Sequence, residues 1–508
     1  MHQKNKDILL PLSLFLLTII TRIPFTTKLL SQWDSVQFAL ATERYDITVH
    51  QPHPPGYFLY VMLGKFLNFF THNANTSFVI ISVVASGLTV SFIFVLANRM
   101  YDRRTAFWSS ILAITSPLFW FYGEVALTYI LEAFLSVFLA YLCWRILNGE
   151  HKLIFLSALF FAFAGGIRQS TMVFLLPLWF YSIRKTPYTY MLLSFVFLAV
   201  AILSWFLPML SMTGGYGQYR AAVDAHWSLT FEPFTVIKMG LKSIIPYAQK
   251  FIHFTIYGLS LCVVFVAFYI FKVGLEEIKK AFLSKRSIFI TFWIIPYMLA
   301  LFLLLIKTAN PGYFLLFMPA LLIVSVRSLV SIRERGYPSA KMFVPVMLLT
   351  VILNLYVFFC TNSYMSVNML KRNDADIADF VKVVSENFSP SDTIILSYDY
   401  AFNGPRHYMY YLPGYRVYII DERVDLRGRK AKVFWGYNHN TLISEALYVP
   451  KGTHFFVSRF DDTSVLNDMI TAGESVNILY RDMKKIAFYG DISLAQKAYS
   501  KVKFEIEK

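Results

Sequence analysis

The residues of this sequence best suited to chemistry are a few acids that stand beside apolar runs, where an isolated charge is costly. Asp34 follows Trp33 just after the first apolar run, and a carboxylate in this position is a candidate general base. The alternative for Asp34 is a solvated loop acid. Glu124 lies between two apolar runs, and Glu132 lies deeper in the second of them. The sequence names no partner for Glu132.

Two cations are candidate phosphate ligands. Arg168 stands in GGIRQS at a predicted helix end, and Lys307 precedes the segment Asn310–Tyr313, which reads NPGY. Arg and Lys are the side chains that bind phosphate groups most readily. In the same NPGY segment, Tyr313 is a candidate for positioning the substrate. The alternative for both cations is a side chain that reaches from the apolar layer to the interface, and the sequence does not decide between the two.

The most distinctive short motif is HPPGY, which runs from His53 to Tyr57. Its two prolines lack backbone donors and hold the chain extended, and a helical pattern starts directly afterwards. We expect the turn to direct His50 and His53 toward the membrane surface, where a lipid phosphate would lie, with Tyr57 as a residue that positions the substrate. The alternative is that the motif only marks the start of a helix.

The composition indicates that lipid is the solvent for most of this chain. Of 508 residues, 56% are hydrophobic and 15% are charged, and the mean hydropathy is +0.52. A net charge of +16 in a soluble protein would suggest nucleic acid, but here it fits basic loops on the cytoplasmic side, so no nucleic-acid partner is expected. Cys143, Cys262 and Cys360 lack metal-ligand spacing, so neither a disulfide framework nor a bound metal is predicted.

Apolar runs predict a polytopic α-helical membrane domain over residues 1–361, with about eleven spans. Placing the N-terminus inside puts basic loops on the cytoplasmic side and puts the long loop Thr26–Ser77 and the candidate site residues outside. Gly56–Phe70 is short for a span and is predicted to lie along the outer surface. The spans are expected near Ile8–Pro24, Phe78–Ala97, Ala106–Phe121, Val125–Leu147, Leu153–Gly166, Thr171–Ile183, Tyr188–Met212, Phe251–Phe271, Ile288–Ile306, Tyr313–Val330 and Met342–Thr361.

The region Asn362–Lys508 has a different pattern, which predicts a small extracytoplasmic α/β domain. Its apolar runs have the length of strands, and a helical pattern at Asp374–Phe388 lies among them. No glycine-rich phosphate-binding loop follows these runs, so no nucleotide cofactor is predicted. The expected strands are Thr393–Ser397, Arg416–Ile420, His454–Val457 and Val476–Tyr480.

The motifs resemble those of the GT-C superfamily of membrane glycosyltransferases, in particular its protein O-mannosyltransferase-like branch. DSVQFALA from Asp34 and HPPGYFLYVMLGKF from His53 are similar to the DSGEF and HPPGYPLY segments of that branch. GEVALTY, with Glu124, resembles the acidic helix start of lipid A aminoarabinose transferases. The sequence departs from two patterns of the family: Ser35 follows Asp34 where classical protein mannosyltransferases have Asp-Glu, and Gln37 replaces the acid of DSGEF. These departures leave the sugar and the acceptor open.

This resemblance implies an inverting transfer of mannose or a similar hexose from a polyprenyl-phosphate donor to a hydroxyl of a protein, lipid or glycan. Asp34 would be the base, Glu124 would support the site, and Arg168, Lys307 and His53 would bind the donor phosphate. A first span that is not cleaved and chemistry on the outer face fit an integral membrane protein of the bacterial plasma membrane, or of the ER membrane in a eukaryote. The alternatives are a transporter or flippase of a lipid-linked glycan, a glycan polymerase or ligase, and a membrane-anchored binding module.

Overall fold

A computed structural model describes residues 2–273, 283–306, 310–335, 341–398, 403–424, 430–435, 442–443, 446–473, 475–500 and 503–506. Lys307 therefore lies outside the described residues. Contacts within the chain define two compact units. Unit 1 comprises Met1–Thr26 and Pro54–Met369, and unit 2 comprises Thr27–His53 and Leu370–Lys508.

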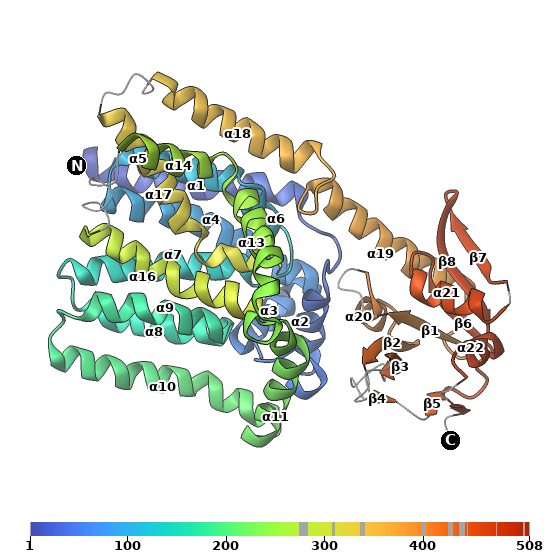
Figure 1. Ribbon diagram of the computed structural model, residues 1–508. Helices are drawn as coiled ribbons and strands as arrows, with labels where there is room; N and C mark the ends of the chain where they lie inside the picture. The colour runs from blue at the N-terminus through green and yellow to red at the C-terminus, as the bar shows by residue number, and fades with distance from the viewer. Residues whose placement is uncertain are drawn as a thin grey trace. The chain divides into compact units, whose positions relative to one another are not determined.

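Unit 1 is built from helices (Figure 1). Its described helices are α1 (His2–Arg22), α3 (Phe58–Thr71), α4 (Ala74–Met100), α5 (Arg103–Thr115), α6 (Pro117–Tyr122), α7 (Tyr129–Leu147), α8 (Leu153–Ile167), α9 (Gln169–Ile183), α10 (Tyr188–Met212), α11 (Tyr216–His226), α12 (Val236–Met239), α13 (Ile244–Leu259), α14 (Cys262–Val273), α16 (Lys285–Ala300), α17 (Met318–Glu334) and α18 (Phe343–Cys360). The helix α19 (Val367–Asn387) begins in unit 1 and continues into unit 2.

The apolar helices make this chain a multi-pass integral membrane protein. Six described helices are long and apolar enough to cross a membrane, or seven if the bent pair Leu241–Leu259 and Cys262–Lys272 is one span. The expected count of about eleven is not confirmed, because several predicted spans are helices such as α5, α8 and α9, which are shorter than the roughly 20 residues that a bilayer requires. The predicted surface segment Gly56–Phe70 is the helix α3, which has 14 residues.

The helix α7 lies at the centre of unit 1, where it packs against α4, α8 and α9. Hydrogen bonds between elements add to this packing: the Ser136 hydroxyl of α7 donates to the Leu316 carbonyl at 2.5 Å and accepts from the Trp293 indole at 2.7 Å. Polar contacts of this kind hold apolar helices together where the hydrophobic effect is weak. They fix α7, whose first turn contributes to the candidate site.

Unit 2 contains an α/β domain. Its described strands are β1 (Thr393–Tyr398), β2 (Arg416–Val424), β3 (Lys430–Trp435), β4 (Leu442–Ile443), β5 (Ala446–Val449), β6 (Phe455–Arg459), β7 (Asn477–Arg481), β8 (Lys484–Asp491) and β9 (Lys503–Ile506), and its other helices are α2 (Trp33–Glu43), α20 (Pro405–Tyr411), α21 (Thr463–Thr471) and α22 (Ile492–Ala498). The main sheet has the order β4-β3-β2-β1-β6-β8-β7, and β5 pairs with β9. In the main sheet β1 is parallel to β2 and β6, and the other pairs are antiparallel. The expected strands are confirmed as β1, β2, β6 and β7, and the expected helix as α19.

The segment Thr27–His53 is part of unit 2 because α19 and α20 bind its backbone. Asp374 accepts from the amides of Lys28 and Leu29 at 2.7 and 3.2 Å. The Leu30 amide donates to the Tyr411 hydroxyl at 2.8 Å. The expected division at residue 361 stays a prediction, and the compact units differ from it in placing this segment with the C-terminal residues.

His407 of α20 is a buried titratable group close to these contacts. The Gly404 amide donates to its Nδ1 atom at 3.1 Å, so this nitrogen is unprotonated in the folded protein. Burial lowers the pKa of His407 to about 4, and the positive charge of Arg459 acts in the same direction. The unfolded chain, with a His pKa near 6.5, therefore binds the proton first as the pH falls.

We predict that unit 2 loses stability as the pH falls from about 6.5 toward 4, by up to about 3 kcal/mol from this group alone. The sign follows from the lowered pKa, because between these values the unfolded state binds more protons. Hydrogen–deuterium exchange of α20 and β1 in the full chain, corrected for intrinsic rates, measures the effect. His407→Asn retains a neutral acceptor and should flatten the pH dependence. An unchanged pH profile in this variant would contradict the assignment.

Candidate active site

The candidate base Asp34 lies in the first turn of α2, next to His53. Its Oδ1 atom is 3.6 Å from His53 Nδ1, and the Asp34 side chain is 32% exposed. The same His53 nitrogen is 2.7 Å from Gln37 Oε1, which only accepts, so Nδ1 carries the proton. The first turn of a helix favours an ionised carboxylate. This arrangement, the Asp34–His53 pair, presents a partly exposed carboxylate at the start of a helix.

The core of unit 2 positions this carboxylate through Trp33. The Trp33 ring packs against a buried cluster that includes Phe380 of α19 and Tyr408 of α20. The Arg406 guanidinium lies 5.5 Å from the centre of the Trp33 ring, and it donates to the Val49 carbonyl at 3.3 Å. One arginine thus contacts both the start of α2 and the chain that leads to His53.

His50 lies in the turn between these residues. Its backbone is left-handed, with φ of 56°, and it follows a short 3-10 helix, Ile47–Val49. Backbone hydrogen bonds join Asp46 and Gln51 in both directions, at 2.6 and 2.9 Å. The turn is therefore fixed by its backbone, while the predicted role of the His50 side chain stays a prediction.

In unit 1 Arg168 is the centre of a second group, the Arg168–tyrosine cluster, formed with Glu132, Tyr57, Tyr129 and Tyr313. Arg168 Nη1 donates to Glu132 Oε1 at 3.1 Å, and both side chains are buried. The guanidinium carbon lies 4.3, 5.4 and 5.7 Å from the ring centres of Tyr313, Tyr129 and Tyr57. Aromatic faces stabilise a cation at these distances, and the carboxylate balances its charge.

Hydroxyl groups complete the surroundings of Glu132. Thr128 donates to Oε1 at 2.7 Å and Thr171 donates to Oε2 at 2.8 Å. Both carboxylate oxygens are therefore hydrogen-bonded, which a buried charge requires. Glu132 thus links the start of α7 to the start of α9.

The segment NPGY positions two of the three tyrosines. The Asn310 amide donates to the Tyr129 hydroxyl at 2.8 Å, while Asn310 Oδ1 accepts from the Gly312 amide at 2.9 Å. A Cβ atom on Gly312 would lie 2.5 Å from the Tyr129 ring, so the close packing of Tyr129 requires glycine here. Tyr313 then follows directly, with its ring on the Arg168 guanidinium.

The end of the HPPGY motif is fixed by α9. The Gln169 side chain donates to the Pro55 carbonyl at 3.3 Å and also exchanges hydrogen bonds with the Tyr219 hydroxyl. Gly56 and Tyr57 both have positive φ values, of 121° and 47°, and α3 begins at the next residue. The predicted helix start after the motif is confirmed.

Glu124 belongs to a different group, in which its main charged neighbour is Arg22 of α1. Both side chains are fully buried. The Arg22 guanidinium stacks 3.9 Å from the Trp120 ring centre and donates to the Ile114 carbonyl at 2.7 Å. Burial raises the pKa of Glu124 well above its usual value, and the charge of Arg22 opposes this effect.

The structure thus places five of the predicted site residues in two separate groups. Asp34 and His53 form one pair, and Arg168, Tyr57 and Tyr313 share one cluster. Sequence reasoning missed Arg22, Tyr129 and the pairing of Glu132 with Arg168. The only sequence signal for that pairing was an acid inside an apolar run, whose partner stands 36 positions away. Among the described residues, no group of three or more His, Cys, Asp or Glu side chains is suited to a metal ion.

The fold of this chain is similar to the folds of solved GT-C glycosyltransferases. Two of the similar structures are crystal structures of ArnT from Cupriavidus metallidurans. The structure in the apo state is 11% identical to this chain over 97% of this chain and 99% of that chain, with a TM-score of 0.58. The structure of ArnT bound to undecaprenyl phosphate matches at 10% identity over 96% of this chain and 98% of that chain, with a TM-score of 0.59. The oligosaccharyltransferase of Archaeoglobus fulgidus, solved with zinc and sulfate, matches at 12% identity over 88% of this chain and 67% of that chain, with a TM-score of 0.50.

A family model agrees with this class. Residues 41–189 match the Protein O-mannosyl-transferase TMEM260 N-terminal domain. The predicted resemblance to the O-mannosyltransferase-like branch is confirmed, and the findings support a glycosyltransferase. The matched range includes His53, Tyr57, Glu124 and Arg168 but begins after Asp34. No match is found among curated protein sequences.

We predict that Glu132→Gln destabilises the protein by about 3–5 kcal/mol, because it leaves the buried Arg168 charge without its counter-charge. The matched control is Glu150→Gln beyond the other end of α7, where Arg145 donates to Glu150 at 2.8 Å and the Glu150 side chain is 43% exposed. The control should cost less than about 1 kcal/mol. Denaturant unfolding of both variants in the same detergent measures the difference. Equal losses of stability would contradict a buried, charge-balanced pair.

Proposed function

We propose that this protein is an inverting glycosyltransferase that moves mannose or a similar hexose from a polyprenyl-phosphate donor to an acceptor hydroxyl. The Asp34–His53 pair is the observation that carries the proposal. In the reaction the acceptor hydroxyl loses its proton to the Asp34 carboxylate, and its oxygen forms a bond to the anomeric carbon. The bond from that carbon to the phosphate oxygen breaks, and polyprenyl phosphate leaves. A single displacement of this kind inverts the anomeric configuration.

The environment of Asp34 suits a general base, which must be ionised, accessible and held in place. Its position in the first turn of α2 favours the charge, and its exposure leaves room for an acceptor. His53 lies against the carboxylate and is oriented by Gln37. We infer that Gln37, which replaces an acid of the family pattern, serves to orient His53. His53 is then a candidate ligand of the donor phosphate.

Arg168 is the proposed ligand of the leaving phosphate in unit 1, where negative charge grows during the reaction. Glu132 accepts a hydrogen bond from Nη1 of Arg168. The planar guanidinium group has further N–H donors that can bind a phosphate. Tyr57 and Tyr313, whose rings lie on this cation, are proposed to position the sugar or the acceptor. One of the similar ArnT structures contains bound undecaprenyl phosphate, which supports a lipid-linked donor here. Lys307 is proposed as a second phosphate ligand from the family resemblance alone.

Glu124 is proposed to support the site rather than to react. It is buried with Arg22 as its main charged neighbour, and burial keeps its pKa high. A group in such surroundings is suited to holding helix ends together and not to accepting a proton from an acceptor. We propose that it fixes α1 against the turn that follows α6.

We predict that Asp34→Asn lowers the rate of donor consumption by about 10²- to 10⁴-fold, the usual contribution of a general base. The assay supplies polyprenyl-phosphate sugars and candidate acceptors to the full chain in lipid, and follows release of polyprenyl phosphate. The matched control is Glu43→Gln, an exposed acid on the same helix, which should leave the rate unchanged.

The two variants should also bind the donor as wild type does, because the base acts on the acceptor. Full activity of a folded Asp34→Asn protein would exclude this residue as the base. Movement of an intact donor across the membrane, without consumption by any variant, would favour the flippase. A product with the same anomeric configuration as the donor would exclude the single displacement.

We predict that unit 2 lies outside the cytoplasm and that the start of α5 faces the cytoplasm, because basic residues such as Arg103 and Arg104 cluster there. In a Cys360→Ser background, Ser385→Cys on the exposed face of α19 should react with a membrane-impermeant thiol reagent in intact spheroplasts. Arg104→Cys, also at an exposed position, should react only after permeabilisation. The opposite pattern would invert the proposed topology.

A further inference from the structure

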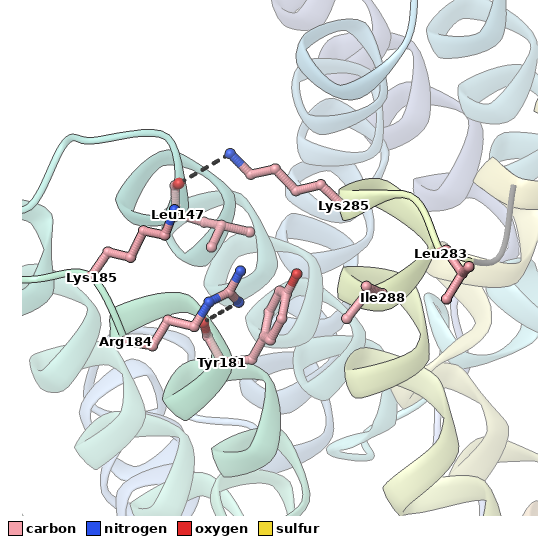
Figure 2. Close-up of a pocket in the computed structure, with 7 residues that line it drawn as sticks. All are labelled: Leu147, Tyr181, Arg184, Lys185, Leu283, Lys285 and Ile288. Atoms are coloured by element: carbon pink, nitrogen blue, oxygen red, sulfur yellow. Dashed lines mark hydrogen bonds between the residues drawn. The ribbon is translucent and has the colours of Figure 1, made fainter. Parts of the chain in front are cut away.

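A basic pocket lies in unit 1 at the far ends of helices that also carry the Arg168–tyrosine cluster. It has a volume of about 250 Å³ and is lined by Leu147, Tyr181, Arg184, Lys185, Leu283, Lys285 and Ile288. Figure 2 shows Lys285 reaching from the start of α16 toward the end of α7, while Arg184 and Lys185 enter from the end of α9. We call this group the basic pocket.

The charges of the basic pocket have one sign. Among the residues that the structure describes, those that line it include Arg184, Lys185 and Lys285 and no carboxylate. The Lys285 amine donates to the Leu147 carbonyl at 3.1 Å and to the Asn148 side chain at 2.7 Å, both neutral groups. Arg184 donates to the Tyr181 carbonyl at 2.9 Å and lies 3.9 Å from the centre of that ring. Neutral polar and aromatic contacts therefore hold Lys285 and Arg184 in place without neutralising their charges.

Glu150, which follows the lining residue Leu147 by three positions, does not line the pocket. Arg145 donates to it at 2.8 Å, and Arg99 lies 3.9 Å away. The remaining wall is apolar, formed by leucine and isoleucine side chains and the Tyr181 ring. Cations beside an apolar wall suit a ligand that has both an anionic group and a hydrocarbon part.

The position of the pocket points to the ligand. Tyr129 begins α7 in the Arg168–tyrosine cluster, and Leu147 ends this helix at the pocket, 19 residues in all. A helix of that length extends for about 28 Å, close to the thickness of a bilayer core. The pocket therefore lies at the opposite surface of the membrane from the cluster, at the depth of lipid headgroups.

We propose that the basic pocket binds the phosphate of an anionic phospholipid in the cytoplasmic leaflet, with the glycerol and upper acyl chain against its apolar wall. Basic pockets between membrane helices on the cytoplasmic side are suited to anionic headgroups. This lipid joins the ends of α7 and α9 to the start of α16. The site is separate from the proposed donor site and does not depend on the proposed reaction.

The experiment uses the purified full chain in mild detergent, after removal of native lipid. Phosphatidylglycerol or phosphatidylcholine is added at equal concentration, and native mass spectrometry measures the lipid retained. The pocket variant is Arg184→Gln, Lys185→Gln and Lys285→Gln together. The control variant is Arg104→Gln, Lys152→Gln and Lys341→Gln, which removes the same charge from exposed positions outside the pocket. Lys185→Gln alone provides a mild variant if the triple variant does not fold.

We expect wild type and the control to retain phosphatidylglycerol at least tenfold better than the pocket variant, and to retain phosphatidylcholine poorly. The single variant should show a smaller loss in the same direction. Equal retention by the pocket and control variants, or no preference of wild type for phosphatidylglycerol, would overturn the proposal. A final arm adds inorganic phosphate alone. Binding of phosphate without retention of phosphatidylglycerol would assign the pocket to a free anion and overturn the lipid assignment.

Discussion

The constraint on which the membrane unit depends is the cost of placing a charge among apolar helices. An ion that leaves water for a medium of low dielectric loses several kcal/mol of hydration, so Arg168 and Glu132 are each tolerated only because the other is present. Their ion pair and the hydroxyls of Thr128 and Thr171 hold the start of α7 against the start of α9. Tyrosine rings pack around the buried Arg168 guanidinium, and the low dielectric of such surroundings strengthens the pair. A polar site among apolar helices therefore also holds those helices together.

The placement of Asp34 follows a different principle, because its segment is fixed by residues far away in the sequence. Asp374 binds the backbone of Lys28 across 346 positions, and Asn373 donates to the Ser31 carbonyl at 2.9 Å. The conformation of the segment is therefore stabilised by contacts with the C-terminal residues. This dependence explains what the α/β domain contributes to a membrane enzyme: its residues fix the position of the proposed base and of His53.

The features that sequence predicted were those set by local patterns. The strands β1, β2, β6 and β7 and the helix start after HPPGY follow from short apolar runs and proline chemistry. The number of spans was not predictable, because membrane helices that pack against one another need not each have full spanning length. The partners of Glu132 and Glu124 were not predictable either, since Arg168 and Arg22 approach them only through the packing of helices. An acid in an apolar run predicts that a partner exists but not which residue it is.

The cations at the two ends of α7 and α9 are stabilised in two different ways. At one end Arg168 is enclosed, so its counter-charge must come from the protein, and Glu132 supplies it. At the other end Arg184, Lys185 and Lys285 remain exposed, and the described residues that line their pocket include no acid. Water alone suffices for exposed cations, but a bilayer surface also offers phosphate at that depth. The internal pair fixes the helices independently of their surroundings, whereas the basic pocket makes their other ends responsive to the charge of the membrane.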